Sequence, residues 1–214
     1  MKRTFDIVCS AVGLLFFSPF FLIMAAAIKL ESPGPVFYRG VRVGRNGKSF
    51  RIFKFRSMVQ GAEKIGASST GDSDSRITRC GMFIRKYKLD EIAQLLNVLL
   101  GDMSMVGPRP EVRKFTDLYT EQEKAVLSVR PGITDWASIR FHNEGEIIEK
   151  SGIADPDEAY LKLIRPEKLR LQLKYVREQS MFLDVKILVC TILTVVSTRM
   201  GGGPVGLPHP VSRA

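Results

Sequence analysis

The chain is poor in the side chains that build zinc sites and disulfide frameworks. Its 214 residues include only three cysteines, Cys9, Cys80 and Cys190, and two histidines, His142 and His209. The cysteines are odd in number and far apart, so neither a zinc site nor a disulfide framework can be read from their spacing. Reduced thiols of this kind fit a protein that faces the cytosol.

A phosphate-cradling Gly-x-x-x-x-Gly-Lys loop is also missing, which argues against a nucleotide-driven kinase or ATPase. Negative charge is in the minority, because 32 Lys and Arg face 22 Asp and Glu and give a formal net charge of +10. We therefore expect a negatively charged partner, such as a phosphorylated substrate, an anionic lipid or a nucleic acid. Nucleic acid is disfavoured, because the chain has neither a helix-turn-helix rhythm nor aromatic residues interleaved on a basic strand.

Residues 7–28 carry no charge and could cross a bilayer as one straight helix. A cleaved signal peptide is the first interpretation, and it would explain Lys2-Arg3 before the run and the small residues 25–27 at its end. Lys29 and the basic, cysteine-poor sequence that follows are instead typical of a protein that stays inside the cell. A simple transmembrane anchor is the second interpretation.

A re-entrant hairpin is the third interpretation of this segment. Pro19 cannot donate a hydrogen bond to the carbonyl of Leu15, whereas the Ser18 hydroxyl can bond a carbonyl freed one turn earlier. A break in the middle of a membrane is tolerated only where such carbonyls find partners. From the residues alone, the spanning and re-entrant interpretations are nearly even.

Two strands are predicted at residues 36–43 and 49–55, joined around Asn46-Gly47, a dipeptide typical of hairpin turns. Alternation places Lys54 and Arg56 on one face of the second strand, so both cations would point the same way. They are either solvated on an edge strand or directed at a substrate. Residues 61–81 are polar and predict a surface loop in which Asp72 and Asp74 are solvated.

The strongest candidate site is the acidic pair Asp90-Glu91. The pair precedes apolar residues at helical spacing, namely Ile92, Leu95, Leu96 and Leu99. It therefore falls in the first turn of a helix, where free N–H groups favour negative charge. Arg85, Lys86 and Lys88 stand just before it, and such cations lower the pKa of a nearby carboxylate. These features indicate a phosphate-handling site, and the alternative is that Asp90 only caps the helix.

An arginine loop follows this helix. Prolines on both sides restrict the backbone of Arg109, which lowers the entropy lost when its guanidinium clasps a phosphate with two parallel bonds. The alternative is a rigid turn in which Arg109 pairs with Glu111 or Asp102. Arg130, which precedes Pro131-Gly132, poses the same choice.

Two helices and a tail are predicted downstream. Residues 166–177 predict a helix with an apolar stripe that packs in a core. Residues 181–196 are apolar but hold Asp184 and Lys186 near their start, which favours a helix at a membrane interface or packed on the domain. A second membrane span is the alternative. Residues 201–214 begin with three glycines and predict a disordered tail.

Taken in order, several blocks resemble the bacterial sugar transferase family, the small monotopic phosphoglycosyl transferases. They are Lys2-Arg3-Thr4-Phe5-Asp6, Phe53-Lys54-Phe55-Arg56-Ser57-Met58, Asp90-Glu91, Gly101-Asp102-Met103-Ser104-Met105-Val106-Gly107-Pro108-Arg109-Pro110-Glu111, Val129-Arg130-Pro131-Gly132-Ile133-Thr134 and Phe182-Leu183-Asp184-Val185-Lys186-Ile187. The resemblance extends over nearly the whole chain and leaves out only the tail after Met200.

The resemblance implies an α+β fold in three parts. Residues 1–30 would form a re-entrant membrane helix-break-helix that bends at Ser18-Pro19, with both ends on the cytoplasmic side. Residues 31–200 would form a catalytic domain with a small β-hairpin, surrounding helices and an interfacial C-terminal helix. Residues 201–214 would be the tail.

The resemblance also implies an activity at the cytoplasmic face of the bacterial inner membrane. A sugar 1-phosphate would pass from a nucleotide diphosphosugar, expected to be a UDP-sugar, to polyprenyl phosphate, with release of UMP and the start of a surface glycan. Asp90 would form an aspartyl-phosphosugar intermediate, and Glu91 would hold Mg²⁺ together with Asp90 or handle protons. The phosphates would bind to Lys54, Arg56, Arg85, Arg109 and Arg130. The phospholipid bilayer and a second copy in a homodimer are further candidate partners.

The chain departs from the family pattern after Ile133-Thr134. Many relatives read Gly-Trp-Ala-Gln-Val-Asn-Gly-Arg there, whereas residues 135–142 read Asp-Trp-Ala-Ser-Ile-Arg-Phe-His. His142 stands opposite the family's arginine and Gln172 opposite an acidic residue, at positions linked in the family with binding the nucleotide sugar. The identity of the sugar therefore stays open.

Two other classes of function also fit the residues: a membrane-surface binding module without catalysis, and a phosphohydrolase of lipid-linked diphosphates.

Overall fold

The structure, a computed structural model, describes residues 1–62 and 74–207. It is mostly helical, with three two-stranded sheets in the described part of the chain. The elements up to the arginine loop are α1 (Lys2–Glu31), β1 (Phe37–Tyr38), β2 (Val41–Val43), the 3₁₀ turn η1 (Arg45–Gly47), β3 (Ser49–Arg51), β4 (Lys54–Phe55), α2 (Arg79–Lys86), the 3₁₀ helix η3 (Leu89–Gln94), α3 (Leu95–Leu100) and β5 (Ser104–Val106).

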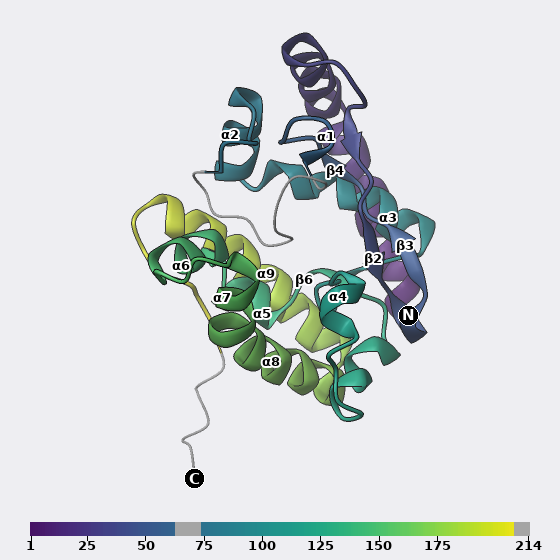
Figure 1. Cartoon of the computed structure of the whole chain (residues 1–214). Coiled ribbons are helices and arrows are strands. Elements are labelled where there is room, and N and C mark those ends of the chain that lie inside the picture. Colours follow the sequence, from purple (N-terminus) through teal and green to yellow (C-terminus); the bar gives the residue numbers. More distant parts are fainter. Residues whose placement is uncertain (63–73, 208–214) are drawn as a thin grey trace.

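The elements after the loop are α4 (Arg113–Thr116), η4 (Glu123–Ser128), β6 (Gly132–Thr134), α5 (Trp136–Arg140), α6 (Glu144–Lys150), α7 (Pro156–Ala159), the π-helical turn η5 (Tyr160–Ile164), α8 (Arg165–Glu178) and α9 (Met181–Arg199). Figure 1 shows α5 to α9 gathered on one side and α1, α3 and the strands β2 to β4 on the other. The expected α+β class is confirmed in its coarse form, as helices with small sheets.

The N-terminal helix α1 continues through Ser18-Pro19, so the predicted interruption of the helix is wrong. The reason is local. Pro19 leaves the carbonyl of Leu15 without its helical donor, and the Ser18 hydroxyl donates to that carbonyl at 2.8 Å. The helix therefore continues past Pro19, and the carbonyl that Pro19 leaves without a donor is satisfied.

Most of α1 is apolar and exposed, and the residues it buries are the ones that join it to the rest of the molecule. Asp6 is 1% exposed, and its Oδ1 accepts hydrogen bonds from Ser104 Oγ and Met105 N, both at 2.9 Å. Met24 and Ile28, near the other end, pack in a core cluster with Phe55 of β4. Both halves of α1 thus rest on the same folded domain.

The predicted β-hairpin is confirmed, although it is split into two short ladders. β2 pairs with β3 and β1 pairs with β4, both antiparallel, with Arg42 opposite Phe50 and Phe37 opposite Phe55. The turn uses Asn46 and Gly47 with φ of 56° and 72°, the left-handed conformation that this dipeptide adopts at low cost.

The predicted loop over residues 61–81 is partly replaced by structure. α2 begins at Arg79, capped by the Thr78 hydroxyl, which accepts a bond from Gly81 N. Asp74 pairs with Arg76 at 2.6 Å, so the prediction that Asp74 is solvated is wrong. Asp72 lies outside the described residues.

The parallel pair of β5 and β6 brings the arginine loop against the segment that follows Arg130. A side chain at Gly107 would lie 2.5 Å from the carbonyl oxygen of Arg130, and one at Gly132 would lie 2.1 Å from the backbone nitrogen of Gly107. Only glycine fits at these two positions, because the backbones touch. This contact fixes where the Arg109 loop leaves the sheet.

The predicted core helix over residues 166–177 is confirmed as α8, which buries Leu169 and Leu171. Residues 181–196 form most of α9, whose Asp184 is 1% exposed and accepts a bond from Tyr175 Oη at 2.7 Å. The predicted disorder is wrong for residues 201–207, since Val205 N donates to Thr194 Oγ1 at 3.0 Å and Leu207 packs on the core. Residues 208–214 lie outside the described residues.

Candidate active site

A cavity of about 960 Å³ lies between the hairpin, η3, the arginine loop and α5. Its lining includes six of the predicted site residues: Lys54, Arg56, Arg85, Asp90, Glu91 and Arg109. Phe17 of α1 and Thr194 and Val195 of α9 also line it, so its wall includes both long apolar helices. A concave site of this size fits a drug-sized or nucleotide-sized ligand.

The acidic pair lies in the first turn of η3, as predicted, although that turn is 3₁₀ rather than α. Lys88, the residue that precedes this helix, has φ 56°, a left-handed conformation that is uncommon for a residue with a side chain. It turns the chain sharply between α2 and η3. The Asp90 side chain is only 12% exposed and lines the cavity.

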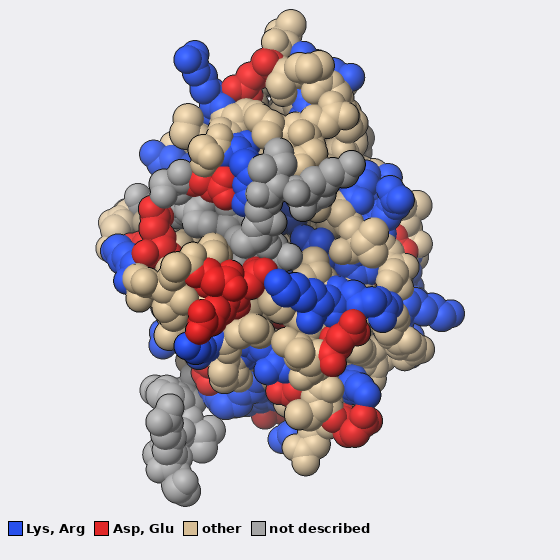
Figure 2. Space-filling model, viewed as in Figure 1, with Lys and Arg blue, Asp and Glu red and all other residues tan. Residues whose placement is uncertain are grey.

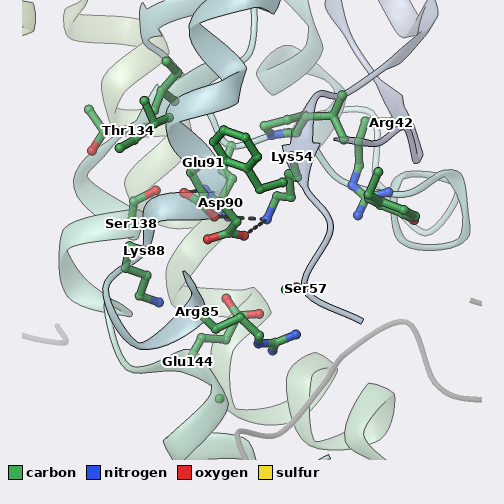
Figure 3. Close-up of a pocket in the computed structure, with 18 of the residues that line it drawn as sticks. Arg42, Lys54, Ser57, Arg85, Lys88, Asp90, Glu91, Thr134, Ser138 and Glu144 are labelled. Atoms are coloured by element: carbon green, nitrogen blue, oxygen red, sulfur yellow. Dashed lines mark hydrogen bonds and ion pairs between the residues drawn. The ribbon is translucent and has the colours of Figure 1, made fainter. Parts of the chain in front are cut away.

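Two cations hold the carboxylates in place. Lys54 Nζ lies 3.3 Å from Asp90 Oδ2 and 3.1 Å from Glu91 Oε1 (Figure 3). Arg109 donates to both oxygens of Glu91, with Nη1 at 2.8 Å from Oε2 and Nη2 bonded to Oε1. Glu91 therefore links the hairpin to the arginine loop, and Asp90 stands beside that link.

The charges of this group favour an ionised Glu91. Burial acts to raise the pKa of Glu91, but the positive charges of Arg109 and Lys54 outweigh it and hold that pKa well below its ordinary value. Burial acts in the opposite direction on Arg109, and the carboxylate of Glu91 outweighs it and raises the pKa of the guanidinium. Glu91 is thus an anion at neutral pH and unsuited to donate a proton there.

The arginine loop is held in position by another acidic residue, Asp135. The backbone N–H of Arg109 donates to Asp135 Oδ2 at 3.2 Å, and the same oxygen accepts from Gln172 Nε2 at 3.0 Å. Asp135 also caps α5, because its Oδ1 accepts from Ser138 N at 2.6 Å. One fully buried carboxylate therefore fixes both the arginine loop and the start of α5.

The guanidinium groups of two predicted phosphate ligands are bonded to backbone carbonyls. Arg56 is 6% exposed and donates to the carbonyls of Ser32 at 2.7 Å and Pro33 at 2.8 Å, where it caps the C-terminal end of α1. The prediction that Lys54 and Arg56 point the same way is therefore wrong, because the strand ends at Phe55 and alternation ends with it. Arg130 Nε donates to the Gly101 carbonyl at 2.9 Å and does not line the cavity.

Other lining residues were not singled out from the sequence. The buried group of Glu111, Tyr160 and Lys168 joins the arginine loop to α8, with Lys168 Nζ at 2.9 Å from Glu111 Oε1. Arg42 of β2 lines the cavity as well. The predicted hairpin could have identified Arg42. Arg42 lies opposite Phe50, so its side chain is on the same face of the hairpin as Phe50 and Lys54.

The positions where the chain departs from the family pattern lie at the cavity or directly behind its wall. His142 and Ser138 line the cavity, and His142 Nδ1 and Ser138 Oγ are buried without a hydrogen-bond partner in the described part of the chain. Gln172 is 1% exposed and reaches the site only through Asp135.

The sequence model of a single family, described as Bacterial sugar transferase, matches residues 1–198. The chain belongs to the bacterial sugar transferase family. Membership accounts for the order of the motifs that the fold brings together, from the N-terminal helix to the start of α9.

Two of the named relatives are much longer than this chain. The chain is 40% identical over 200 residues to a UDP-N-acetylgalactosamine-undecaprenyl-phosphate N-acetylgalactosaminephosphotransferase of Aeromonas hydrophila, and the match covers 92% of this chain and 44% of the relative. It is 37% identical over 197 residues to a UDP-glucose:undecaprenyl-phosphate glucose-1-phosphate transferase of Escherichia coli, with 90% and 39% covered. The chain thus spans less than half the length of these two relatives.

A relative of similar length is the exopolysaccharide production protein PSS of Rhizobium leguminosarum. It is 37% identical over 212 residues, and the match covers 94% of this chain and 98% of that protein. The motifs of this family are therefore present in proteins of this length.

The carboxylates of Asp90 and Glu91 are the candidate ligands for a metal ion. In residues 1–62 and 74–207, no three His, Cys, Asp or Glu side chains cluster as a ready-made metal site. Mg²⁺ in phosphoryl-transfer sites usually takes only one or two carboxylates and completes its shell with substrate phosphates and water. The adjacent carboxylates of Asp90 and Glu91 fit an ion bound in that way.

Proposed function

We propose that this chain transfers a sugar 1-phosphate from a UDP-sugar to polyprenyl phosphate, and so starts the assembly of a surface glycan. One observation carries the proposal: the Asp90-Glu91 pair, held by Lys54 and Arg109, lies in a cavity walled partly by the apolar helices α1 and α9. The relatives' names, which pair a UDP-sugar with undecaprenyl phosphate, agree with such a site.

The first half of the reaction uses Asp90 as nucleophile. Its carboxylate oxygen attacks the phosphorus attached to the sugar, a bond from that oxygen to phosphorus forms, and the bond to the bridging oxygen breaks. UMP leaves with that oxygen and its electron pair. No proton is needed in this step, because the attacking group is already an anion.

Electrostatic repulsion is the main obstacle, since a carboxylate approaches a dianionic diphosphate. Lys54 and Arg109 offset that charge, and Arg85 adds a third cation from α2. Asp90 and Glu91 are the residues that would hold Mg²⁺, which supplies further neutralisation of the phosphate oxygens when bound. Glu91 serves here as the fixed anion that orients Lys54 and Arg109.

In the second half, an oxygen of polyprenyl phosphate attacks the phosphorus of the aspartyl-phosphosugar. The acyl-phosphate bond breaks, Asp90 regains its carboxylate and the lipid-linked diphosphosugar is formed. Phe17 and Val195 offer apolar surface in the same cavity as the carboxylates, where the first isoprene units of the acceptor can lie.

We also propose that α1 is re-entrant, with both ends at the cytoplasmic face of the inner membrane and a bend within the continuous helix at Ser18-Pro19. α1 and α9 are both long and apolar enough to cross a membrane. Yet Lys2, at one end of α1, pairs with Asp184 at 2.5 Å, and Ile28 and Ser32, at the other, bond to Arg56. If α1 crossed the membrane as a straight helix, its two ends would lie on opposite sides of the bilayer. Both ends could not then contact a domain that lies wholly on one side.

The experiment that tests the activity is a UMP-release assay with purified protein, polyprenyl phosphate, Mg²⁺ and a panel of UDP-sugars. Repeated release of UMP that requires the lipid acceptor, with at most one UMP per protein molecule in its absence, supports the transferase. Binding to anionic vesicles without UMP release from any donor would favour a membrane-surface module, and release of phosphate from a lipid-linked diphosphate would favour a hydrolase.

A further inference from the structure

Arg42 differs from four other cations that line the cavity, namely Lys54, Arg56, Arg109 and Lys168. Lys54 and Arg109 are paired with Glu91, Lys168 is paired with Glu111, and the Arg56 guanidinium bonds backbone carbonyls. Arg42, in contrast, forms no ion pair with a carboxylate in the described part of the chain. Its Nη1 donates to the carbonyl of Val41 at 2.9 Å, and its guanidinium also interacts with the Tyr38 side chain.

The surroundings of Arg42 compensate its charge only in part. Burial lowers the pKa of Arg42, and the positive charge of Arg109 acts in the same direction, while the Tyr38 side chain and the carboxylate of Glu111 oppose them. A guanidinium stays protonated under these conditions. The cost of holding it there is offset when an anion enters, and a guanidinium binds phosphate through two parallel bonds.

The position of Arg42 separates it from the cations nearest the apolar helices. Arg85 lies on α2, which packs against the C-terminal end of α1 and exposes Met82 and Phe83. Arg42 lies on the hairpin, beyond Lys54 as seen from Asp90, whereas Arg85 lies below the carboxylates (Figure 3).

The surface around the hairpin is basic and faces water. Figure 2 shows a band of Lys and Arg side chains across this face of the molecule. The hairpin and the start of α4 contribute exposed cations to the surface: Arg45, Lys48, Arg51 and Arg113. This basic surface attracts water-soluble anions toward the hairpin that carries Arg42, whereas α2, which carries Arg85, packs against the apolar helix α1.

We propose that Arg42 binds the phosphate of the nucleoside monophosphate that leaves in the first half of the reaction. The proposal rests on the proposed function. In that step the oxygen that bridges the two phosphates takes the electron pair of the breaking bond, so negative charge grows on the leaving phosphate. Arg42 stabilises this charge, while Lys54 and Arg109 serve the phosphate that stays on Asp90.

The test compares Arg42→Gln and Arg42→Lys with Arg51→Gln. Arg51 lies on the adjacent strand β3, is exposed and does not line the cavity, so its variant removes one charge from the same hairpin. The full-length proteins in detergent are titrated with UMP by calorimetry. Single-turnover mixing then measures the formation of the phosphosugar intermediate and its reaction with polyprenyl phosphate separately.

We expect Arg42→Gln to weaken UMP binding about tenfold or more and to slow formation of the intermediate, while the reaction of a preformed intermediate with polyprenyl phosphate stays within twofold. Arg42→Lys keeps the positive charge but loses the paired N–H donors of the guanidinium. Its affinity for UMP should therefore fall between those of the wild type and Arg42→Gln. Arg51→Gln binds UMP as the wild type does.

Unchanged UMP affinity in Arg42→Gln would overturn the proposal, as would an equal loss in Arg51→Gln, which would indicate only the general charge of the hairpin. A defect confined to the second half would assign Arg42 to the lipid phosphate and also overturn it. These outcomes differ from failure of the proposed function itself, in which the wild-type protein releases no UMP from any donor.

Discussion

Arg109 is bonded to Glu91 through both of its terminal nitrogens and makes no such bond to Asp90. Lys54 reaches both carboxylates, but its contact with Asp90 is the longer one, at 3.3 Å against 3.1 Å to Glu91. Glu91 therefore makes most of the contacts with the two cations. Asp90 Oδ1 has no hydrogen bond in the described part of the chain, which leaves an oxygen available for attack.

The first prediction separates a nucleophile from a helix cap. Asp90→Asn should fold, because Asn and Asp cap helices about equally well, and should lose the covalent intermediate and nearly all turnover. Incubation of the wild type with its UDP-sugar and Mg²⁺, without lipid acceptor, should leave a sugar phosphate that peptide mass spectrometry places on Asp90. Full activity in Asp90→Asn, with deamidation excluded, would refute the mechanism.

The second prediction concerns the arginine loop. Arg109→Ala should lower kcat/KM by about 10²-fold or more, because a charged donor aimed at the phosphates is lost and Glu91 is left with Lys54 alone. Arg130→Ala is the matched control, since Arg130 stands before a similar proline but bonds Gly101 outside the cavity. Equal loss in both variants would show that rigidity of the loops, rather than phosphate binding, is what matters.

The third prediction concerns the buried pair beneath the site. Lys168→Met should destabilise the protein by about 3–5 kcal/mol, because it leaves the Glu111 carboxylate buried without its cation. Chemical denaturation measures the loss. Lys168→Met combined with Glu111→Gln should recover much of it, and a double variant as unstable as Lys168→Met would contradict the explanation.

The fourth prediction is the pH dependence of that pair. Burial acts to raise the pKa of Glu111, but Lys168 and Tyr160 outweigh it and lower that pKa below its ordinary value of 4.5. The stability that Glu111 contributes is therefore present above about pH 4.5 and is lost as the pH falls through the lower, folded-state value. Denaturation midpoints between pH 7 and pH 3 should fall more steeply for the wild type than for Glu111→Gln. Parallel profiles would show that Glu111 gains nothing on folding.

The fifth prediction tests the topology of α1. In a variant whose three cysteines are replaced by alanine, single cysteines at Thr4 and Leu30, both exposed, mark the two ends of the helix. A membrane-impermeant thiol reagent should leave both unlabelled in intact cells and label both after the inner membrane is opened. Labelling of either one from outside would rule out the re-entrant arrangement.

Local patterns in the sequence were sufficient for the hairpin turn, the acidic first turn and the core helix α8. Asn46-Gly47 favours left-handed backbone for steric reasons that act within the turn, and apolar residues at helical spacing predict that the α8 segment is helical. The same local reasoning failed at Arg56, because alternation applies only while the strand lasts and β4 ends at Phe55. It also failed at Pro19, where the hydroxyl of Ser18 satisfies the freed carbonyl and the helix goes on.

The sequence by itself determined the acidic pair, the prolines around Arg109 and the family, because these depend on which residues stand next to one another. Only the tertiary structure decided which cation meets which anion. Glu91 pairs with Arg109 across 18 positions, and Arg42 shares the cavity because β2 and β3 pair in one particular register. Such contacts follow from the packing of α1, the hairpin and α5 around one cavity, and no local pattern specifies the distance between side chains so far apart in the chain.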